Sequence, residues 1–163
     1  METPKAPMGT IIVEEVPAAS TRPLRHAVLR PNQPMDACIY PGDDDPKSTH
    51  FAAYQGASPG EESIVGVASL YAQGLDEQPE DGSWRLRGMA TREQVRGKGY
   101  GSALAEACIR HVREQGGYRL WCNGRTTVLG FYSRFGFAPR GEEFDIPGLG
   151  PHYVMELILG GPS

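Results

Sequence analysis

Val95-Arg96-Gly97-Lys98-Gly99-Tyr100-Gly101-Ser102 is the stretch that decides the fold, because it sets three glycines and two cations directly ahead of a helical pattern. Glycine has no side chain, so a loop built from it leaves the backbone N–H groups uncovered. Where such a loop runs into a helix N-terminus, it forms a site for a phosphate or a pyrophosphate. A glycine-rich turn without a ligand is the alternative, and the surrounding sequence has to decide between the two.

The loop lies between two predicted strands. One strand is expected over Trp84–Ala90 and the other over Tyr118–Cys122, with helical spacing of apolar residues between them until Gly116-Gly117. Strand, loop, helix and strand form a βαβ unit, whose crossover is right-handed and whose strands are parallel. Alternation in the first strand gives one face to Trp84, Leu86, Gly88 and Ala90, and the other to Arg85, Arg87 and Met89.

The rest of the chain predicts a mixed α/β fold in a single domain over residues 9–160, with a disordered leader over residues 1–8 and a tail over residues 161–163. A long loop is expected over residues 31–48, and a solvated hairpin loop over residues 72–83. The remaining strands are expected at residues 11–16, 50–55, 63–71, 137–144 and 152–159, and the remaining helices at residues 18–30 and 126–135.

Composition narrows the class of protein. A formal net charge of −4 over 163 residues argues against a nucleic-acid partner, which usually meets a basic surplus. No apolar run approaches the roughly 20 residues of a membrane span, and Met1–Lys5 lacks the apolar core of a signal peptide. The three cysteines, Cys38, Cys108 and Cys122, have no metal-ligand spacing. We therefore expect buried free thiols, no metal, no membrane partner and a cytoplasmic location.

Two other nucleotide loops are excluded by spacing. A P-loop, G-x-x-x-x-G-K-[ST], needs a glycine five positions before Gly97, where the chain has Arg92, and a Ser or Thr after Lys98, where it has Gly99. A dinucleotide loop, G-x-G-x-x-G, fails because Gly97, Gly99 and Gly101 are spaced by two throughout.

The remaining order, Arg96-x-x-Gly99-x-Gly101, resembles the R/Q-x-x-G-x-G/A acyl-CoA loop of the GCN5-related N-acetyltransferases. Phe131-Tyr132-x-x-x-Gly136-Phe137 resembles the F-Y-x-x-x-G-F segment of the same family. Trp121–Asn123, Gly141–Phe144 and Pro151–Met155 look like the ElaA-like branch. The resemblance covers roughly residues 63–159.

The resemblance implies a mixed, mostly antiparallel sheet of six to seven strands, flanked by three to four helices. The sheet would splay between its fourth and fifth strands, and acetyl-CoA would lie in that gap as co-substrate. The N–H of Met89 would donate to the carbonyl oxygen of the thioester, and Arg134 is a candidate for the 3′-phosphate. The residues expected to contact acetyl-CoA are Met89, Ala90, Thr91, Arg96, Gly97, Lys98, Gly99, Tyr100, Gly101, Ser102 and Asn123.

Tyr132 is the expected catalytic residue. In the family, this tyrosine protonates the leaving thiolate, and a phenol with a pKa near ~10 is able to do so or to hydrogen-bond the sulfur. Many relatives have N-x-x-A before the F-Y pair, where this chain has Arg125 and Val128. Asn123 is our substitute for that asparagine as a contact to the pantetheine arm.

The resemblance implies direct attack of an amine on the thioester. Glu143, Asp145, His152 and a chain of waters remain alternatives for the group that accepts the proton of the amine. The acceptor is expected to be a small-molecule or peptide amine, and the triple acid Asp43–Asp45 hints at a cationic one. A non-catalytic acyl-CoA sensor or regulatory module is the alternative function. Both a monomer and a homodimer remain open.

Overall fold

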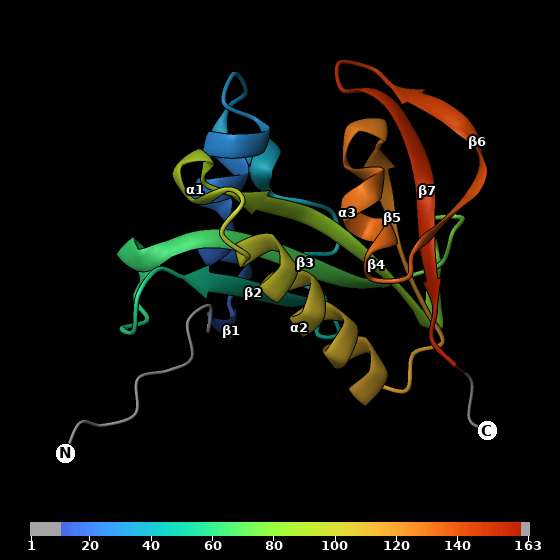
Figure 1. Cartoon of the computed structure of the whole chain (residues 1–163), viewed down its shortest axis with the longest axis horizontal. Coiled ribbons are helices and arrows are strands. Elements are labelled where there is room, and N and C mark those ends of the chain that lie inside the picture. Colours follow the sequence, from blue (N-terminus) through green and yellow to red (C-terminus); the bar gives the residue numbers. More distant parts are fainter. Residues whose placement is uncertain (1–10, 161–163) are drawn as a thin grey trace.

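The computed structural model describes residues 11–160. The expected leader over residues 1–8 and the tail over residues 161–163 lie outside the described residues. Seven strands form one sheet in the order β1-β2-β3-β4-β5-β7-β6 (Figure 1). Their bounds are β1 Ile12–Val16, β2 Thr49–Tyr54, β3 Ile64–Gln73, β4 Pro79–Thr91, β5 Arg119–Arg125, β6 Ala138–Ile146 and β7 Gly150–Ile158.

Three α-helices and several short turns complete the fold. The helices are α1 Arg22–Leu24, α2 Tyr100–Glu114 and α3 Leu129–Ser133. The turns are η1 Ala18–Thr21, η2 Arg25–Leu29, η3 Met35–Cys38, η4 Glu61–Ser63, η5 Glu93–Val95 and η6 Thr126–Val128. None of the helices in residues 11–160 is both long enough and apolar enough to cross a membrane.

The helix expected over residues 18–30 is broken into three parts. A 3₁₀ turn, η1, leads into the single turn α1, and η2 continues with wider π spacing, so that Arg30 N donates to Arg25 O at 3.0 Å. Pro23 has no N–H to offer to the preceding turn, which limits regular α-helix on its N-terminal side. The helix expected over residues 126–135 is likewise η6 followed by α3.

The sheet is covered on both faces. Phe51 and Ala53 of β2 pack in the core cluster that contains α2, while Ala52 and Tyr54 pack in the cluster that contains Leu24 of α1. Every residue of β2 is buried, as expected for a strand between two layers. The three cysteines are buried and free, as predicted.

Only β4 and β5 run parallel within residues 11–160, and they soon part. Three residue pairs join them, Ser83↔Arg119, Trp84↔Leu120 and Arg85↔Trp121. Beyond Arg85, β4 continues against β3 as far as Thr91, whereas β5 continues against β7 as far as Arg125. In Figure 1 the two halves diverge, because β3 and β4 run across the picture whereas β5–β7 rise toward its upper right. The mixed, mostly antiparallel and splayed sheet is thus confirmed.

A bulge interrupts β4 inside the splayed part. The register against β3 slips by one residue between two pairs, Ser69↔Arg87 and Val67↔Ala90. Gly88 has a φ of +69°, a conformation that favours glycine, and the extra residue shifts the alternation of faces. Ala90 therefore packs on the α1 face and Met89 against the α2 cluster. The predicted alternation across Trp84–Ala90 is wrong from Gly88 onward.

The hairpin between β3 and β4 is shorter than expected. Both strands extend into the predicted loop over residues 72–83, so that only residues 74–78 connect them. Gly74 N and Gln78 O close this turn at 2.8 Å. Of the four acids in residues 72–83, Asp76 and Glu77 lie in the turn, and Glu80 and Asp81 lie in β4.

Candidate active site

The glycine loop ends at the start of α2. Gly97 has a φ of +80° and Gly99, the N-cap, a φ of +94°, so both adopt the left-handed conformation that favours glycine. No side chain caps α2, and no acid lies in its first turn. The first N–H groups of a helix have no partner within it, and they carry the positive end of its dipole. This end of α2 is therefore suited to an anion.

A cleft of about 400 Å³ opens at this point. Its lining contains two arginines and no acid, and it combines the loop with residues of β4 and α3. Arg134 lies over the ring of Phe131, with 5.5 Å from its guanidinium carbon to the ring centre. The lining residues are Thr91, Val95, Arg96, Gly97, Gly99, Tyr100, Gly101, Ser102, Phe131 and Arg134.

Seven of the predicted contact residues thus line one cleft, and four do not. Lys98 is exposed outside the lining, and Ala90 is buried against the α1 side. Met89 is half-buried on the α2 side, and Asn123 is half-buried on β5. A role through the backbone N–H groups of Met89 and Ala90 does not depend on where their side chains point. The assignments of all eleven residues as contacts to acetyl-CoA remain predictions.

Val95 and Phe131 line the cleft but were not predicted from the sequence. Phe131 belongs to the F-Y pair, and its ring lies 3.6 Å from the position that a Cβ would take on Gly101. The signal was present in the sequence, because adjacent helical residues point about 100° apart and only one of the pair faces the core. Phe131 faces the cleft, and Tyr132 faces the core.

Tyr132 is buried against β5, where its ring lies 3.4 Å from the position that a Cβ would take on Gly124. Its ring lies 5.2 Å from that of Phe131 and 5.5 Å from that of Phe137, centre to centre. Burial raises the pKa of Tyr132, and the neighbouring Cys122 raises it further. Burial also raises the pKa of the Cys122 thiol to about 12. At neutral pH both groups keep their protons, so Tyr132 is a donor and Cys122 is not a thiolate nucleophile.

The three candidates for the base lie on β6 and β7, outside the lining of the cleft. Glu143 and Asp145 are exposed on β6. His152 is buried on β7, with its Nδ1 2.8 Å from Gly150 O. Nothing in this geometry favours one of them over a chain of waters.

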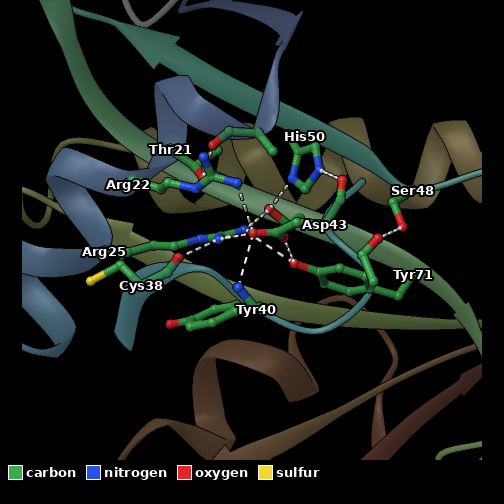
Figure 2. Close-up of polar contacts among 12 residues, drawn as sticks. Thr21, Arg22, Arg25, Cys38, Tyr40, Asp43, Ser48, His50 and Tyr71 are labelled. Atoms are coloured by element: carbon green, nitrogen blue, oxygen red, sulfur yellow. Dashed lines mark hydrogen bonds and ion pairs between the residues drawn. The ribbon is translucent and has the colours of Figure 1, made fainter. Parts of the chain in front are cut away.

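A buried polar cluster lies on the opposite face of the sheet from α2, centred on Arg25 (Figure 2). The Arg25 side chain is fully buried, and its guanidinium donates to both oxygens of Asp43 at 2.7 and 3.1 Å. It also donates to Cys38 O, Ser69 Oγ and Tyr71 Oη, at 2.8 to 3.1 Å. The cluster joins η2, the long loop and β3 into one unit.

Asp43 is fully engaged within this cluster. It accepts from the Tyr71 hydroxyl at 2.5 Å and from the Tyr40 amide at 3.0 Å, in addition to Arg25. Burial alone would raise the pKa of Asp43, but these hydrogen bonds lower it to about 2. Of the triple acid, only Asp44 and Asp45 are exposed. A cationic acceptor therefore has no access to Asp43.

No group of three or more His, Cys, Asp or Glu side chains in residues 11–160 is arranged to hold a metal ion. The arrangement offers an anion cleft that includes the end of β4, a sheet whose strands β4 and β5 part, and a protonated tyrosine packed against Phe131 of the cleft.

Comparison with known proteins agrees with this geometry. A model described as the acetyltransferase (GNAT) family matches residues 15–137. An uncharacterized N-acetyltransferase of Bacillus subtilis (strain 168), YitI, is 35% identical over 147 residues, which is 90% of this chain and 95% of that protein.

Solved structures share the fold at low identity. ElaA of Escherichia coli matches with a TM-score of 0.71 at 18% identity, over 90% of this chain and 99% of that one. An aminoglycoside 6′-N-acetyltransferase complexed with coenzyme A matches with a TM-score of 0.70 at 14% identity, over 93% of this chain and 99% of that one.

Proposed function

The chain belongs to the acetyltransferase (GNAT) family, and from that premise we propose that it transfers an acetyl group from acetyl-CoA to a primary amine. The observation that carries the proposal is the cleft at the N-terminus of α2, where the glycine loop, two arginines and no acid meet. The aminoglycoside acetyltransferase of the same fold was solved with coenzyme A, which supports this choice of donor.

The pyrophosphate of the donor would bind the loop. Its negative charge matches the amides of residues 97–102 and the positive end of α2. Arg96 adds charge from the loop, and Arg134 from beyond α3 is our candidate for the 3′-phosphate. Lys98 is exposed outside the cleft, so we expect it to act only through long-range charge.

The pantetheine arm would enter the gap between β4 and β5. Thr91 connects the cleft to β4, and the backbone of Met89 and Ala90 continues the path into the gap. The bulge at Gly88 turns the peptide groups that follow it out of the regular ladder. We assign the Met89 N–H as donor to the carbonyl oxygen, which gains negative charge on attack, and Asn123 as a contact from β5.

The reaction would be a direct displacement. The amine nitrogen forms a bond to the thioester carbon, the carbon–sulfur bond breaks, and the nitrogen loses a proton to water or to a carboxylate. Tyr132 would meet the leaving sulfur as a protonated phenol. Its raised pKa lies above that of an ordinary thiol, near ~8.5, so the hydroxyl mainly stabilises the thiolate by a hydrogen bond.

Thiol release from acetyl-CoA tests the proposal against a panel of small amines, polyamines, amino acids and peptide N-termini. We expect release that depends on the amine and leaves one acetylated amine for each thiol. Calorimetric titration of CoA runs in parallel. Binding of CoA with no release for any amine supports the sensor alternative, and absence of CoA binding refutes both functions.

A further inference from the structure

Three guanidinium groups surround the ring of Tyr40 on the face opposite α2. Their central carbons lie 4.1 Å from the ring centre for Arg25, 4.4 Å for Arg87 and 5.4 Å for Arg30. Arg25 is neutralised by Asp43. Within residues 11–160, neither Arg30 nor Arg87 forms an ion pair with a carboxylate. The positive charge beside Tyr40 is therefore not balanced by the described part of the protein.

Arg85 extends this surplus along β4. It lies over the ring of Trp121 at 4.9 Å, and its only carboxylate partner in residues 11–160 is Glu77, at 3.5 Å, whose own side chain is 60% exposed. The Nε of Arg85 is buried without a hydrogen-bond partner. Burial lowers the pKa of Arg85, and the charge of Arg87 lowers it further. We call Arg30, Arg85 and Arg87 the arginine patch.

Arg85 and Arg87 of the arginine patch lie near the point where β4 and β5 part, away from the cleft in which we propose that the donor binds. Arg85 is the last residue of β4 that pairs with β5, and Arg87 directly precedes the bulge. Thr91, at the other end of the same segment, lines the anion cleft. Met89 lies between them, two residues from Arg87 across the bulge. An amine that reached the Met89 backbone along β4 from the end away from the cleft would pass Arg87.

We propose that the acceptor is an amine that also carries an anionic group, a carboxylate or a phosphate, which Arg87 binds while Arg30 and Arg85 add charge. This inference rests on the proposed function and names its substrate class. A guanidinium matches either anion with two parallel hydrogen bonds. A polyamine or an aminoglycoside would bring further positive charge to a patch in which Arg30 and Arg87 have no ion-pair partner within residues 11–160, so such acceptors are disfavoured.

The buried cluster explains how the patch is held together despite its repulsion. The Tyr40 amide donates to Asp43, whose carboxylate is fixed by Arg25 (Figure 2). The Tyr40 ring is buried, and it offers its π-face to the guanidinium groups. Tyr40 and Asp43 are therefore positioning residues for Arg87 and do not touch the acceptor themselves.

Matched acceptors test the substrate class. For three amino acids of different size, each is compared with its amide and with its decarboxylated amine, and 2-aminoethyl phosphate is compared with ethanolamine. Thiol release gives kcat and KM, and calorimetry gives binding to the CoA-saturated protein without turnover. We expect kcat/KM to favour the anionic member of at least one set by roughly 10- to 100-fold. The carboxylate and phosphate arms identify which anion is bound.

Variants at position 87 tie this preference to the patch. Arg87→Met keeps the length of the side chain and removes the charge, and we expect it to abolish the preference while KM for acetyl-CoA stays unchanged. Arg87→Lys should restore part of it. Arg113→Met, the same change at an exposed position of α2, is the matched control and should keep the full preference.

Several results overturn the inference and leave the proposed function intact. These are equal or better rates with the neutral or polycationic amines, or an Arg87→Met variant that slows anionic and neutral amines alike. A failure of the proposed function looks different, because CoA then does not bind, or no amine at all is acetylated. If CoA binds without turnover, calorimetry still decides, since equal affinities for anionic and neutral amines contradict the arginine patch as an anion site.

Discussion

At the scale of one residue, the proposed reaction depends on the hydroxyl of Tyr132, which we expect to stabilise the leaving thiolate. We expect Tyr132→Phe to lower kcat at least tenfold, because it removes the hydroxyl and little volume. The KM for acetyl-CoA should change little, since Tyr132 does not line the cleft. The loss of one hydrogen bond should cost about 1 kcal/mol of unfolding free energy or less. Thiol-release kinetics and urea unfolding measure these three quantities.

Tyr118→Phe is the matched control for that change. Tyr118 directly precedes β5, its hydroxyl donates to Glu80 of β4, and the residue is 39% exposed. This variant should keep the wild-type kcat. A Tyr132→Phe enzyme with the same kcat as Tyr118→Phe would remove Tyr132 from the mechanism and leave it a core residue.

At the scale of an element, we propose that the loop before α2 binds the donor. Gly99 has a φ of +94°, so Gly99→Ala places a Cβ in a conformation that costs about 1–2 kcal/mol. We expect this variant to lose about that much unfolding free energy and to bind CoA at least tenfold more weakly, because the loop amides are no longer held in place. Calorimetry and urea unfolding check both effects.

Gly101→Ala, two residues further on, is the matched control. Gly101 lies in the first turn of α2 without a positive φ, and an added Cβ there meets only Phe131, at 3.6 Å. Folding should be unaffected or slightly stabilised, by up to about 1 kcal/mol, and CoA binding should change less than for Gly99→Ala. Equal effects of the two variants would contradict a role for the backbone conformation at Gly99.

The long loop before β2 is tied to η2 by one buried ion pair. Because the pKa of Asp43 is lowered from 3.8 to about 2, its contribution to stability is complete above about pH 4. This contribution is lost as the pH falls through about 2, and it amounts to about 2 kcal/mol. Asp43→Asn leaves Arg25 buried without its counter-charge, so we expect a loss of about 3–5 kcal/mol at pH 7.

Urea unfolding between pH 6 and pH 2 measures this dependence. Asp44→Asn, an exposed neighbour, should follow the wild-type curve. Asp43→Asn should lose less stability than wild type between pH 4 and pH 2, because its side chain no longer titrates. Parallel curves for all three proteins would show that Asp43 is not the group responsible. If Asp43→Asn does not fold, wild type and Asp44→Asn are compared alone, and an unchanged stability of both between pH 4 and pH 2 would contradict the predicted titration of Asp43.

The βαβ unit could be predicted because local signals agree there. The glycine loop, the helix that begins within it and the flanking strands follow from spacing alone. The bulge at Gly88 could not be foreseen, because its register depends on pairing with residues of β3, Ser69 opposite Arg87 and Val67 opposite Ala90. The same holds for the partners of Arg25, since Asp43 lies 18 residues away and Tyr71 lies 46 residues away. Long-range contacts therefore account for what sequence analysis missed on the acceptor side.

The whole molecule is built as two sheet halves joined through three parallel residue pairs. A donor that binds in the gap should stabilise the facing segments of both halves and leave the outer strands unchanged. We expect CoA to slow amide hydrogen exchange in residues 86–91, 97–103 and 122–125, with little effect on β1 and β6. Protection confined to the loop would mean that the ligand binds at α2 without entering the splay.

Release of thiol from acetyl-CoA in the presence of an amine is the most direct measurement of the central claim. With the amine panel described above, we predict release at a rate that saturates with both acetyl-CoA and the accepted amine, together with formation of one acetylated amine per thiol. Release that no amine accelerates above the amine-free rate, from a protein that binds CoA, would contradict the claim that this cleft serves acetyl transfer.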